Sequence, residues 1–329
     1  MMDRRDFLRA AGSAGLAGAL PAVAAEPPPE TTRIRLAQVG GVCFAPIFVA
    51  EQLMRAEGFS DVQYVRSGGG SATTPMLAKG EVDITVRYVA SNVLDVDAGL
   101  PIVMLAGIHP GCFELIGGRK VQTVRDLKDK TVAIASEGST QHVFLAAVAS
   151  QIGLKPKNDI KWIEVSLKDQ LQQLGDERVD AVMTFPPVAQ EARAKGIGRV
   201  IVNSVVDKPW SQYFCCSIVA NRDFVRRHPV AAKRATRALL KATDLCATSP
   251  ETTARYLVDR KFAESYDYTL QAIREIPYRS WRDFSAEDSV RFWALRLHET
   301  GFVKSSPNKI ITDGTDWRFL SDLKRELKT

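Results

Sequence analysis

The sequence predicts an α/β protein with two similar lobes, each a doubly wound sheet with helices packed against it. Three observations support this prediction. Short apolar strands alternate with helical stretches from Arg33 onward, the alternation restarts near residue 123, and one short phrase occurs in both halves. With 329 residues, 45% hydrophobic and 25% charged, the chain is long enough to form two cores of moderate size.

The first half alternates strands and helices up to about residue 106. Its apolar runs have the length of buried strands, and a glycine-rich run at 68–71 leads into one of its helices. A βαβ series of this kind predicts a parallel sheet. The expected strands are 34–39, 62–66, 83–86 and 102–106, and the expected helices are 46–55, a stretch ending at Lys79, and 91–98.

The second half repeats this plan. The phrase Leu-Ala-Lys-Gly-Glu-Val-Asp at 77–83 resembles Leu-Gly-Asp-Glu-Arg-Val-Asp at 174–180, so a helix in each half should return to its sheet through a similar turn. Thr123 and Asp126 have the spacing of a capping box. The expected strands are 131–135, 160–165, 180–184 and 200–202, and the expected helices are 139–152, one capped by Ser166, and 187–195.

The pattern changes after residue 211. A β-like run at 213–220 has no helix directly beside it, and helices dominate beyond Pro229. Pro229 suits the first turn of a helix reaching about Cys246. Ser285 begins another helix, which ends at Gly301 and carries apolar residues on one face. We expect these helices to complete the first lobe.

The N-terminus resembles a twin-arginine export signal, because Arg-Arg-Asp-Phe-Leu-Arg occupies 4–9 and a weakly apolar Ala/Gly-rich stretch follows. Small residues allow cleavage after Ala24 or Ala25. No segment has the roughly 20 apolar residues that a membrane span requires. The sequence therefore predicts a signal peptide at 1–25, a linker at 26–32 and a periplasmic location.

Five cysteines, at 43, 112, 215, 216 and 246, have no spacing typical of a disulfide framework or a metal site. Neighbours on a strand point to opposite faces, so Cys215 and Cys216 are expected to be two buried thiols and not joint ligands. We predict no metal, no cofactor and no catalytic residue. The net charge of +6 is spread along the chain, which predicts no nucleic-acid partner.

Several phrases resemble the NMT1/THI5-like periplasmic binding proteins of the nitrate/sulfonate/taurine type, over residues 33 to about 250. They are Ala-Pro-Ile-Phe-Val-Ala at 45–50, Ser-Gly-Gly-Gly-Ser at 67–71, Gly-Glu-Val-Asp-Ile at 80–84, and the stretches 124–133, 179–181 and 220–229. The resemblance implies a type II periplasmic-binding-protein fold whose lobes are joined by two crossing strands, near 108–115 and 210–219. Lobe 1 would comprise 33–110 and 217–329, and lobe 2 would comprise 111–216.

The resemblance also implies a function: the periplasmic solute-binding component of an ABC importer. It would capture a small anionic, aromatic or heterocyclic solute in the cleft, act with a transporter permease, and be a monomer. One alternative is a THI5-like pyrimidine-synthesising enzyme, and another is a module that senses a ligand for a receptor. The export route also suggests a redox or metal protein, although the sequence supplies no evident ligand set.

Open sheets bind ligands beyond the carboxyl ends of their strands, where helix starts present unpaired N–H groups. Gly69, Gly70 and Ser71 lie at such a helix start in lobe 1, and Ser139, Thr140 and Gln141 lie at another in lobe 2. Arg87 is expected to pair with an acidic group, and aromatic rings to enclose a planar ligand. The candidates at strand ends and crossings, within 40–44, 87–88, 109–113, 185–187 and 210–213, are Gly41, Cys43, Phe44, Arg87, Tyr88, His109, Phe185, Trp210 and Tyr213.

Overall fold

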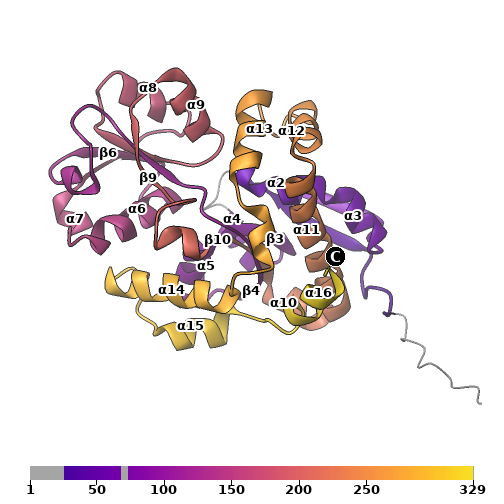
Figure 1. The fold of residues 1–329 in the computed structure, drawn as a ribbon. Helices are drawn as coiled ribbons and strands as arrows, with labels where there is room; N and C mark the ends of the chain where they lie inside the picture. The colour runs from indigo at the N-terminus through magenta and orange to yellow at the C-terminus, as the bar shows by residue number, and fades with distance from the viewer. Residues whose placement is uncertain (1–25, 68–72, 329) are drawn as a thin grey trace, which may run out of the picture.

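Two five-stranded sheets form the centres of two lobes in the computed structural model, which describes residues 26–67 and 73–328 (Figure 1). We call the lobe around sheet β2-β1-β3-β10-β4 lobe 1, and the lobe around sheet β7-β6-β8-β5-β9 lobe 2. The predicted two-lobed α/β fold is confirmed. The strands are β1 (Arg33–Gln38), β2 (Asp61–Arg66), β3 (Ile84–Tyr88), β4 (Ile102–Pro110), β5 (Glu114–Gly117), β6 (Thr131–Ile134), β7 (Lys161–Glu164), β8 (Ala181–Thr184), β9 (Arg199–Asn203) and β10 (Phe214–Asn221).

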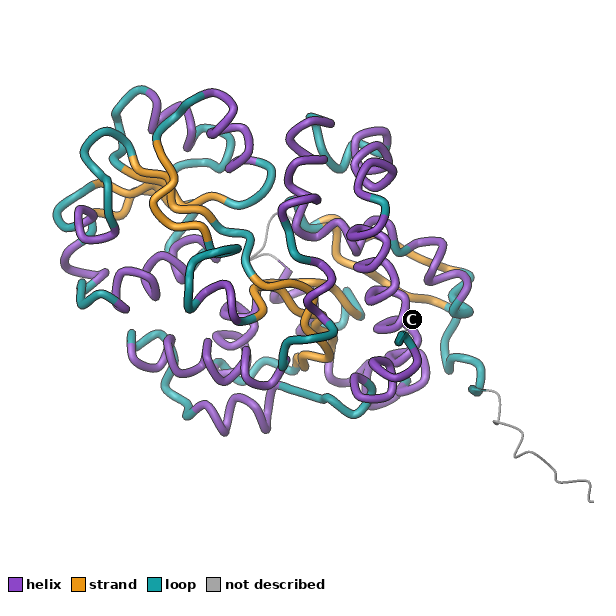
Figure 2. The backbone as a smooth tube through the Cα atoms, viewed as in Figure 1, coloured by secondary structure: helices purple, strands orange, loops and turns teal. Residues whose placement is uncertain are grey.

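Both sheets are mixed: the strands of each predicted βαβ series run in one direction, and one antiparallel crossing strand is inserted among them. Strands β1, β2 and β3 are parallel, as are β6, β7 and β8, but β10 runs antiparallel to β3 and β4, and β5 runs antiparallel to β8 and β9. The antiparallel strands are those that enter each sheet directly from the other lobe. The chain crosses between β4 and β5 and again between β9 and β10, and Figure 2 shows the strands gathered into two groups.

The repeated phrase has the same structural role in both lobes. In lobe 1, Asp83 donates its backbone N–H to the Arg35 carbonyl at 2.9 Å and its carboxylate accepts the Arg35 N–H at 2.8 Å. In lobe 2, Asp180 makes the same pair of bonds with Thr131, at 2.8 and 2.9 Å. Each aspartate thereby fixes the start of one strand against the first strand of its half.

The helices cover both sheets; α14 and α15 form a layer with α5, while α16 lies against α11. Helix α14 packs against α5 and α15, as Figure 1 also shows. None of the helices within 26–67 and 73–328 combines the length and apolarity that crossing a bilayer requires. The helices are α2 (Ala45–Val49), α3 (Glu51–Ala56), α4 (Thr73–Ala78), α5 (Val89–Asp97), α6 (Thr140–Gln151), α7 (Pro156–Asp159), α8 (Gln170–Gly175), α9 (Val188–Lys195), α10 (Arg222–Arg227), α11 (Pro229–Thr248), α12 (Pro250–Asp259), α13 (Tyr266–Glu275), α14 (Ala286–Glu299), α15 (Pro307–Gly314) and α16 (Leu320–Glu326).

Aromatic rings join the two lobes at their boundary. Tyr88 at the end of β3 contacts Phe113, with ring centres 5.2 Å apart, and Trp293 of α14, at 5.1 Å. Phe113 in turn stacks on Phe144 of α6 at 5.0 Å. One continuous apolar core therefore runs from lobe 1 through the crossing into lobe 2.

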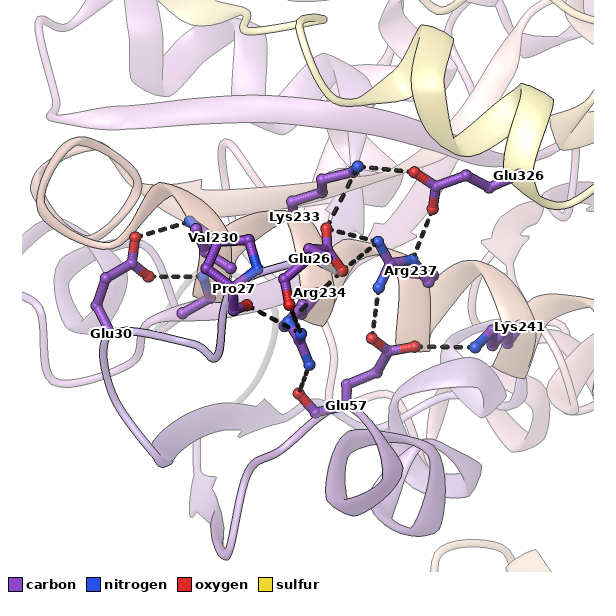
Figure 3. Close-up of polar contacts among 11 residues, drawn as sticks. Glu26, Pro27, Glu30, Glu57, Val230, Lys233, Arg234, Arg237, Lys241 and Glu326 are labelled. Atoms are coloured by element: carbon purple, nitrogen blue, oxygen red, sulfur yellow. Dashed lines mark hydrogen bonds and ion pairs between the residues drawn. The ribbon is translucent and has the colours of Figure 1, made fainter. Parts of the chain in front are cut away.

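The segment after the predicted signal is held against α11, although we expected a linker there (Figure 3). The Glu30 carboxylate accepts the N–H groups of Val230 and Ala231 at 2.9 and 2.8 Å, where the helix start favours an acidic partner. Arg237 of α11 binds Glu26 at 2.8 Å, and Figure 3 shows it between that residue and two further carboxylates. These are the buried carboxylate of Glu57, at 2.6 Å, and that of Glu326, at 2.9 Å.

Candidate functional site

A cavity of about 320 Å³ lies between the lobes, a volume at the lower end of the range for small-molecule sites. Both lobes and the crossing segment contribute to its walls. Most of the lining is apolar or aromatic, with hydroxyl, thiol and amide groups among it. The lining residues are Val39, Gly40, Cys43, Phe44, Tyr88, Cys112, Phe113, Ala135, Ser136, Ser139, Thr140, Gln141, Leu167, Phe185 and Cys216.

Lobe 1 approaches lobe 2 closely through the turn after β1. Gly41 has φ of 123°, which favours glycine, and a Cβ atom built on it would lie 3.3 Å from the Phe185 ring. The next residue, Val42, donates its N–H to the Pro186 carbonyl of lobe 2 at 3.1 Å. Gly41 therefore lies beside the cavity at the contact between lobes, and it places Cys43 and Phe44 in the wall.

Tyr88 brings a buried hydroxyl to the cavity. The residue is 2% exposed, and its Oη has no hydrogen-bond partner among the described residues. Burial raises the pKa of Tyr88 well above its ordinary value, so the group remains a protonated donor. An unpartnered buried hydroxyl is costly. Tyr88 belongs to the cavity wall, and its hydroxyl is left without an acceptor among the described residues.

The opposite wall is the start of α6. Ser139 caps this helix, its Oγ accepting the N–H of His142 at 3.4 Å. Gln141 is held by bonds from its side-chain amide to the Met183 carbonyl, at 2.7 Å, and to Gln170 Oε1, at 3.2 Å. The N–H groups of Thr140 and Gln141 belong to the first helical turn, where no intrahelical acceptor exists. This wall therefore offers donors to an acceptor atom of a solute.

No charged side chain lines the cavity within the described residues, since the lining set contains no Asp, Glu, Lys, Arg or His. Arg87, expected to meet an acidic ligand, is 4% exposed and binds Asp95 at 2.5 Å and Thr74 Oγ1 at 2.6 Å. Its charge is already compensated beneath α4 and α5, so the expected ligand contact is replaced by an internal ion pair. The lining residues that the structure describes therefore supply no cation to neutralise a strongly anionic solute.

Three further predicted residues do not line the cavity: His109 and Trp210 are buried, and Tyr213 is half-buried. His109 contacts the Cys43 carbonyl at 3.3 Å and the ring of Tyr278 edge-on. Burial alone would lower the pKa of His109, but its interaction with Cys216 leaves that pKa above the ordinary value. Trp210 stacks on Trp293, and Tyr213 stacks on Phe292 at 4.0 Å. Helix α14 supplies both of these partners, so it covers the second crossing that the sequence placed at the cavity.

Seven of the predicted residues line the cavity. They are Cys43, Phe44, Tyr88, Ser139, Thr140, Gln141 and Phe185. Gly69, Gly70 and Ser71 lie outside the described residues, so they stay predictions. Ala135 and Leu167 were missed, although both closely follow strands at their carboxyl ends, the rule that found Phe185. Val39 directly follows β1 and could have been found by the same rule.

Cys112 and Cys216 complete the floor of the cavity with Cys43. The expectation that Cys215 and Cys216 point to opposite faces is wrong, because their sulfurs are 3.8 Å apart. The pairing of β10 with β4 shifts register on both sides of Cys216, and such an irregularity breaks the alternation of side chains. Although burial opposes a thiolate, hydrogen bonds from the neighbouring thiols and the charge of His109 hold the pKa of Cys216 well below its ordinary value.

Two family models match the sequence. Residues 27–259 match the NMT1-like family, and residues 1–21 match the signal sequence of the TAT (twin-arginine translocation) pathway, which confirms the predicted export signal. No curated protein sequence matches the chain.

Solved structures with the same fold include the periplasmic nitrate-binding protein NrtA from Synechocystis PCC 6803. It has a TM-score of 0.77 and 16% identity, over 92% of this chain and 90% of that chain. The alkanesulfonate-binding protein SsuA from Xanthomonas axonopodis pv. citri, bound to MOPS, has a TM-score of 0.70 and 17% identity, over 84% and 96%. The aliphatic sulphonate binding protein SsuA from Escherichia coli has a TM-score of 0.68 and 18% identity, over 84% and 90%.

Proposed function

The chain belongs to the NMT1-like family and carries a twin-arginine signal that directs it to the periplasm, and from that premise we propose that it is the solute-binding component of an ABC importer. Structures of similar fold include periplasmic binding proteins for nitrate and sulfonates. In this role the protein captures a small organic solute between its lobes and presents it to a transporter permease.

The observation that carries the proposal is the paired construction of the cavity. Lobe 1 contributes the donor hydroxyl of Tyr88, and lobe 2 contributes the first turn of α6. A solute that spans both walls has more contacts when the lobes are together, and this differential affinity favours the closed arrangement. Closure on binding is what lets a permease distinguish the loaded protein from the empty one.

We propose an uncharged aromatic or heterocyclic solute with at least one acceptor atom. The rings of Phe44, Tyr88, Phe113 and Phe185 surround the cavity, while no charged side chain of the described residues lines it. A nitrate or sulfonate would rely on uncharged donors alone, whereas a flat neutral ring suits the aromatic walls. This narrows the earlier expectation, which included anionic ligands.

We also propose that the protein binds its solute without transforming it. Acid–base catalysis requires a titratable group near the reacting atoms, and the described lining offers only thiols and Tyr88 as titratable groups. We propose Cys43, Phe44, Tyr88, Ser139, Thr140, Gln141 and Phe185 as solute contacts. The sequence predicted lobe 1 as 33–110 with 217–329 and lobe 2 as 111–216. We propose the same lobes, except that lobe 1 resumes at Phe214, where β10 begins.

A thermal-shift screen followed by calorimetry tests this function. The screen compares neutral N-heterocycles and hydroxylated aromatics with aliphatic sulfonates and nitrate. We expect a neutral ring compound to raise the melting temperature, since a ligand at 100 times its Kd adds about 2.7 kcal/mol of stability.

A variant test is Thr140→Ala, which removes one hydroxyl from the α6 wall and should weaken solute binding while leaving the fold intact. Tight binding of sulfonates or nitrate alone would contradict the proposed solute class. Conversion of a pyridoxal phosphate substrate in the presence of iron would contradict the binding role and support the pyrimidine-synthesising alternative.

A further inference from the structure

Three cysteines far apart in the sequence meet at the floor of the cavity. Cys43 lies in the turn η1 (Val42–Phe44), Cys112 lies in the crossing between β4 and β5, and Cys216 lies in β10. Their sulfur atoms all lie within 4.8 Å of one another. Each residue is at most 4% exposed, yet all three belong to the cavity wall. The cluster is therefore shielded from bulk water and open toward the space between the lobes.

A fourth sulfur lies beside this group. Cys215 Sγ is 3.3 Å from Cys112 Sγ and 3.8 Å from Cys216 Sγ, a result of the register shifts in β10. The fifth cysteine, Cys246 of α11, belongs to no such group within the described residues. Cys246 shows how this chain uses a buried thiol as a small apolar side chain. The four clustered thiols differ from it because they converge from three segments upon one point.

The spacing is that of a thiolate metal site. Metal–sulfur bonds of about 2.3 Å place three sulfurs roughly 4.0 Å apart around a trigonal ion and about 3.8 Å apart around a tetrahedral one. Sulfurs that already lie within 4.8 Å of one another need to move by less than about 1 Å to reach either arrangement. Thiolates are soft ligands, and they select soft or borderline ions over Mg²⁺ or Ca²⁺.

We propose that Cys43, Cys112 and Cys216 bind a thiophilic metal ion at the floor of the cavity. On binding, each ligand that still carries an S–H proton releases it to the solvent as its metal–sulfur bond forms, with no change in oxidation state. The remaining coordination position faces either Cys215 or the cavity. This site does not depend on the proposed transport function, because it needs neither an organic solute nor a permease.

The test uses Cd²⁺ as the probe, with the reduced, metal-free protein purified from the periplasm and kept anaerobic. We expect one Cd²⁺ per chain, near-ultraviolet thiolate-to-metal charge-transfer absorption, and a rise in melting temperature. Cys112→Ser and Cys216→Ser should each weaken binding by more than about 100-fold, since losing an outer-shell partner already costs roughly 10- to 100-fold. Cys246→Ser, which alters an equally buried thiol in α11, should keep full binding.

Two further measurements keep the proposal open to refutation if a serine variant does not fold. A ¹¹³Cd NMR resonance of the wild-type protein reports the number of thiolate ligands, and a resonance typical of oxygen and nitrogen ligands would overturn the proposal. A thiol count of three instead of five in freshly exported protein, with Cys112 and Cys215 joined, would also overturn it. Solute binding, measured separately on metal-free protein, tests the transport function independently.

Discussion

The two walls of the cavity differ in how deeply they are built into the molecule. The lobe 1 wall includes three residues that are also part of the core: Cys43, Tyr88 and Cys216 are 2%, 2% and 1% exposed. The lobe 2 wall includes the first turn of α6 and residues that follow strands β6, β7 and β8, and among these Thr140 is half-buried and Leu167 is 41% exposed. Truncating a side chain of the lobe 1 wall should therefore lower the free energy of unfolding more than truncating one of the lobe 2 wall.

The largest expected effect is that of Tyr88→Ala in the lobe 1 wall. Removing a ring packed against Phe113 and Trp293 should lower the free energy of unfolding by about 3–5 kcal/mol, measured by urea denaturation. Tyr88→Phe is the matched control. It keeps the ring and removes a hydroxyl without a partner in the described residues, so stability should hold while solute affinity falls. If Tyr88→Ala lowers the free energy of unfolding by less than about 1 kcal/mol, Tyr88 is not part of the core, which would contradict this comparison.

A smaller effect is expected from Ser139→Ala, which removes the cap of α6. Loss of a serine cap should cost about 1 kcal/mol, and it should also weaken solute binding because this turn lines the cavity. Ser265→Ala removes the corresponding cap of α13, where the hydroxyl also accepts an N–H at 3.4 Å. That variant should lose similar stability with unchanged affinity. Equal affinity losses in both variants would argue against α6 as a binding wall.

The smallest effect concerns pH and His142, in the same turn of α6. Burial lowers the pKa of His142 below its ordinary value of 6.5, and its Nδ1 accepts the Gly138 N–H at 3.0 Å, a bond that protonation removes. Because the unfolded chain binds this proton more readily, stability should be full above pH 6.5 and fall as the pH drops through the lowered pKa. His142→Gln should flatten this dependence in urea denaturation, while His298→Gln on the exposed face of α14 should retain the wild-type slope.

The sequence was sufficient for features that depend on local chemistry. Alternating strands and helices and the Ser139 cap follow from neighbouring residues, the repeated phrase showed that Asp83 and Asp180 have equivalent places, and the strand-end rule located part of the lobe 2 wall. The partner of the Arg87 side chain could not be predicted, because it depends on which face of α5 carries Asp95.

The other failures depended on long-range packing. Trp210 and Tyr213 are covered by α14, whose position no local pattern specifies. The convergence of Cys43, Cys112 and Cys216 required both a register irregularity in β10 and the approach of segments more than 60 residues apart in the sequence. In an ideal strand, Cys215 and Cys216 would point to opposite faces, so the strand pattern did not predict the cysteine cluster at the floor of the cavity.

The contacts of Arg237 have a consequence for engineering this molecule. Glu26 and Glu326 bind the same guanidinium, so the beginning and the end of the described chain meet on one helix. A short peptide could join them, and new termini could be opened at an exposed turn of lobe 2, such as the one at Glu177. Such a circular permutant would allow a fluorescent reporter to be inserted in lobe 2, away from the original ends, to follow the lobes as they close.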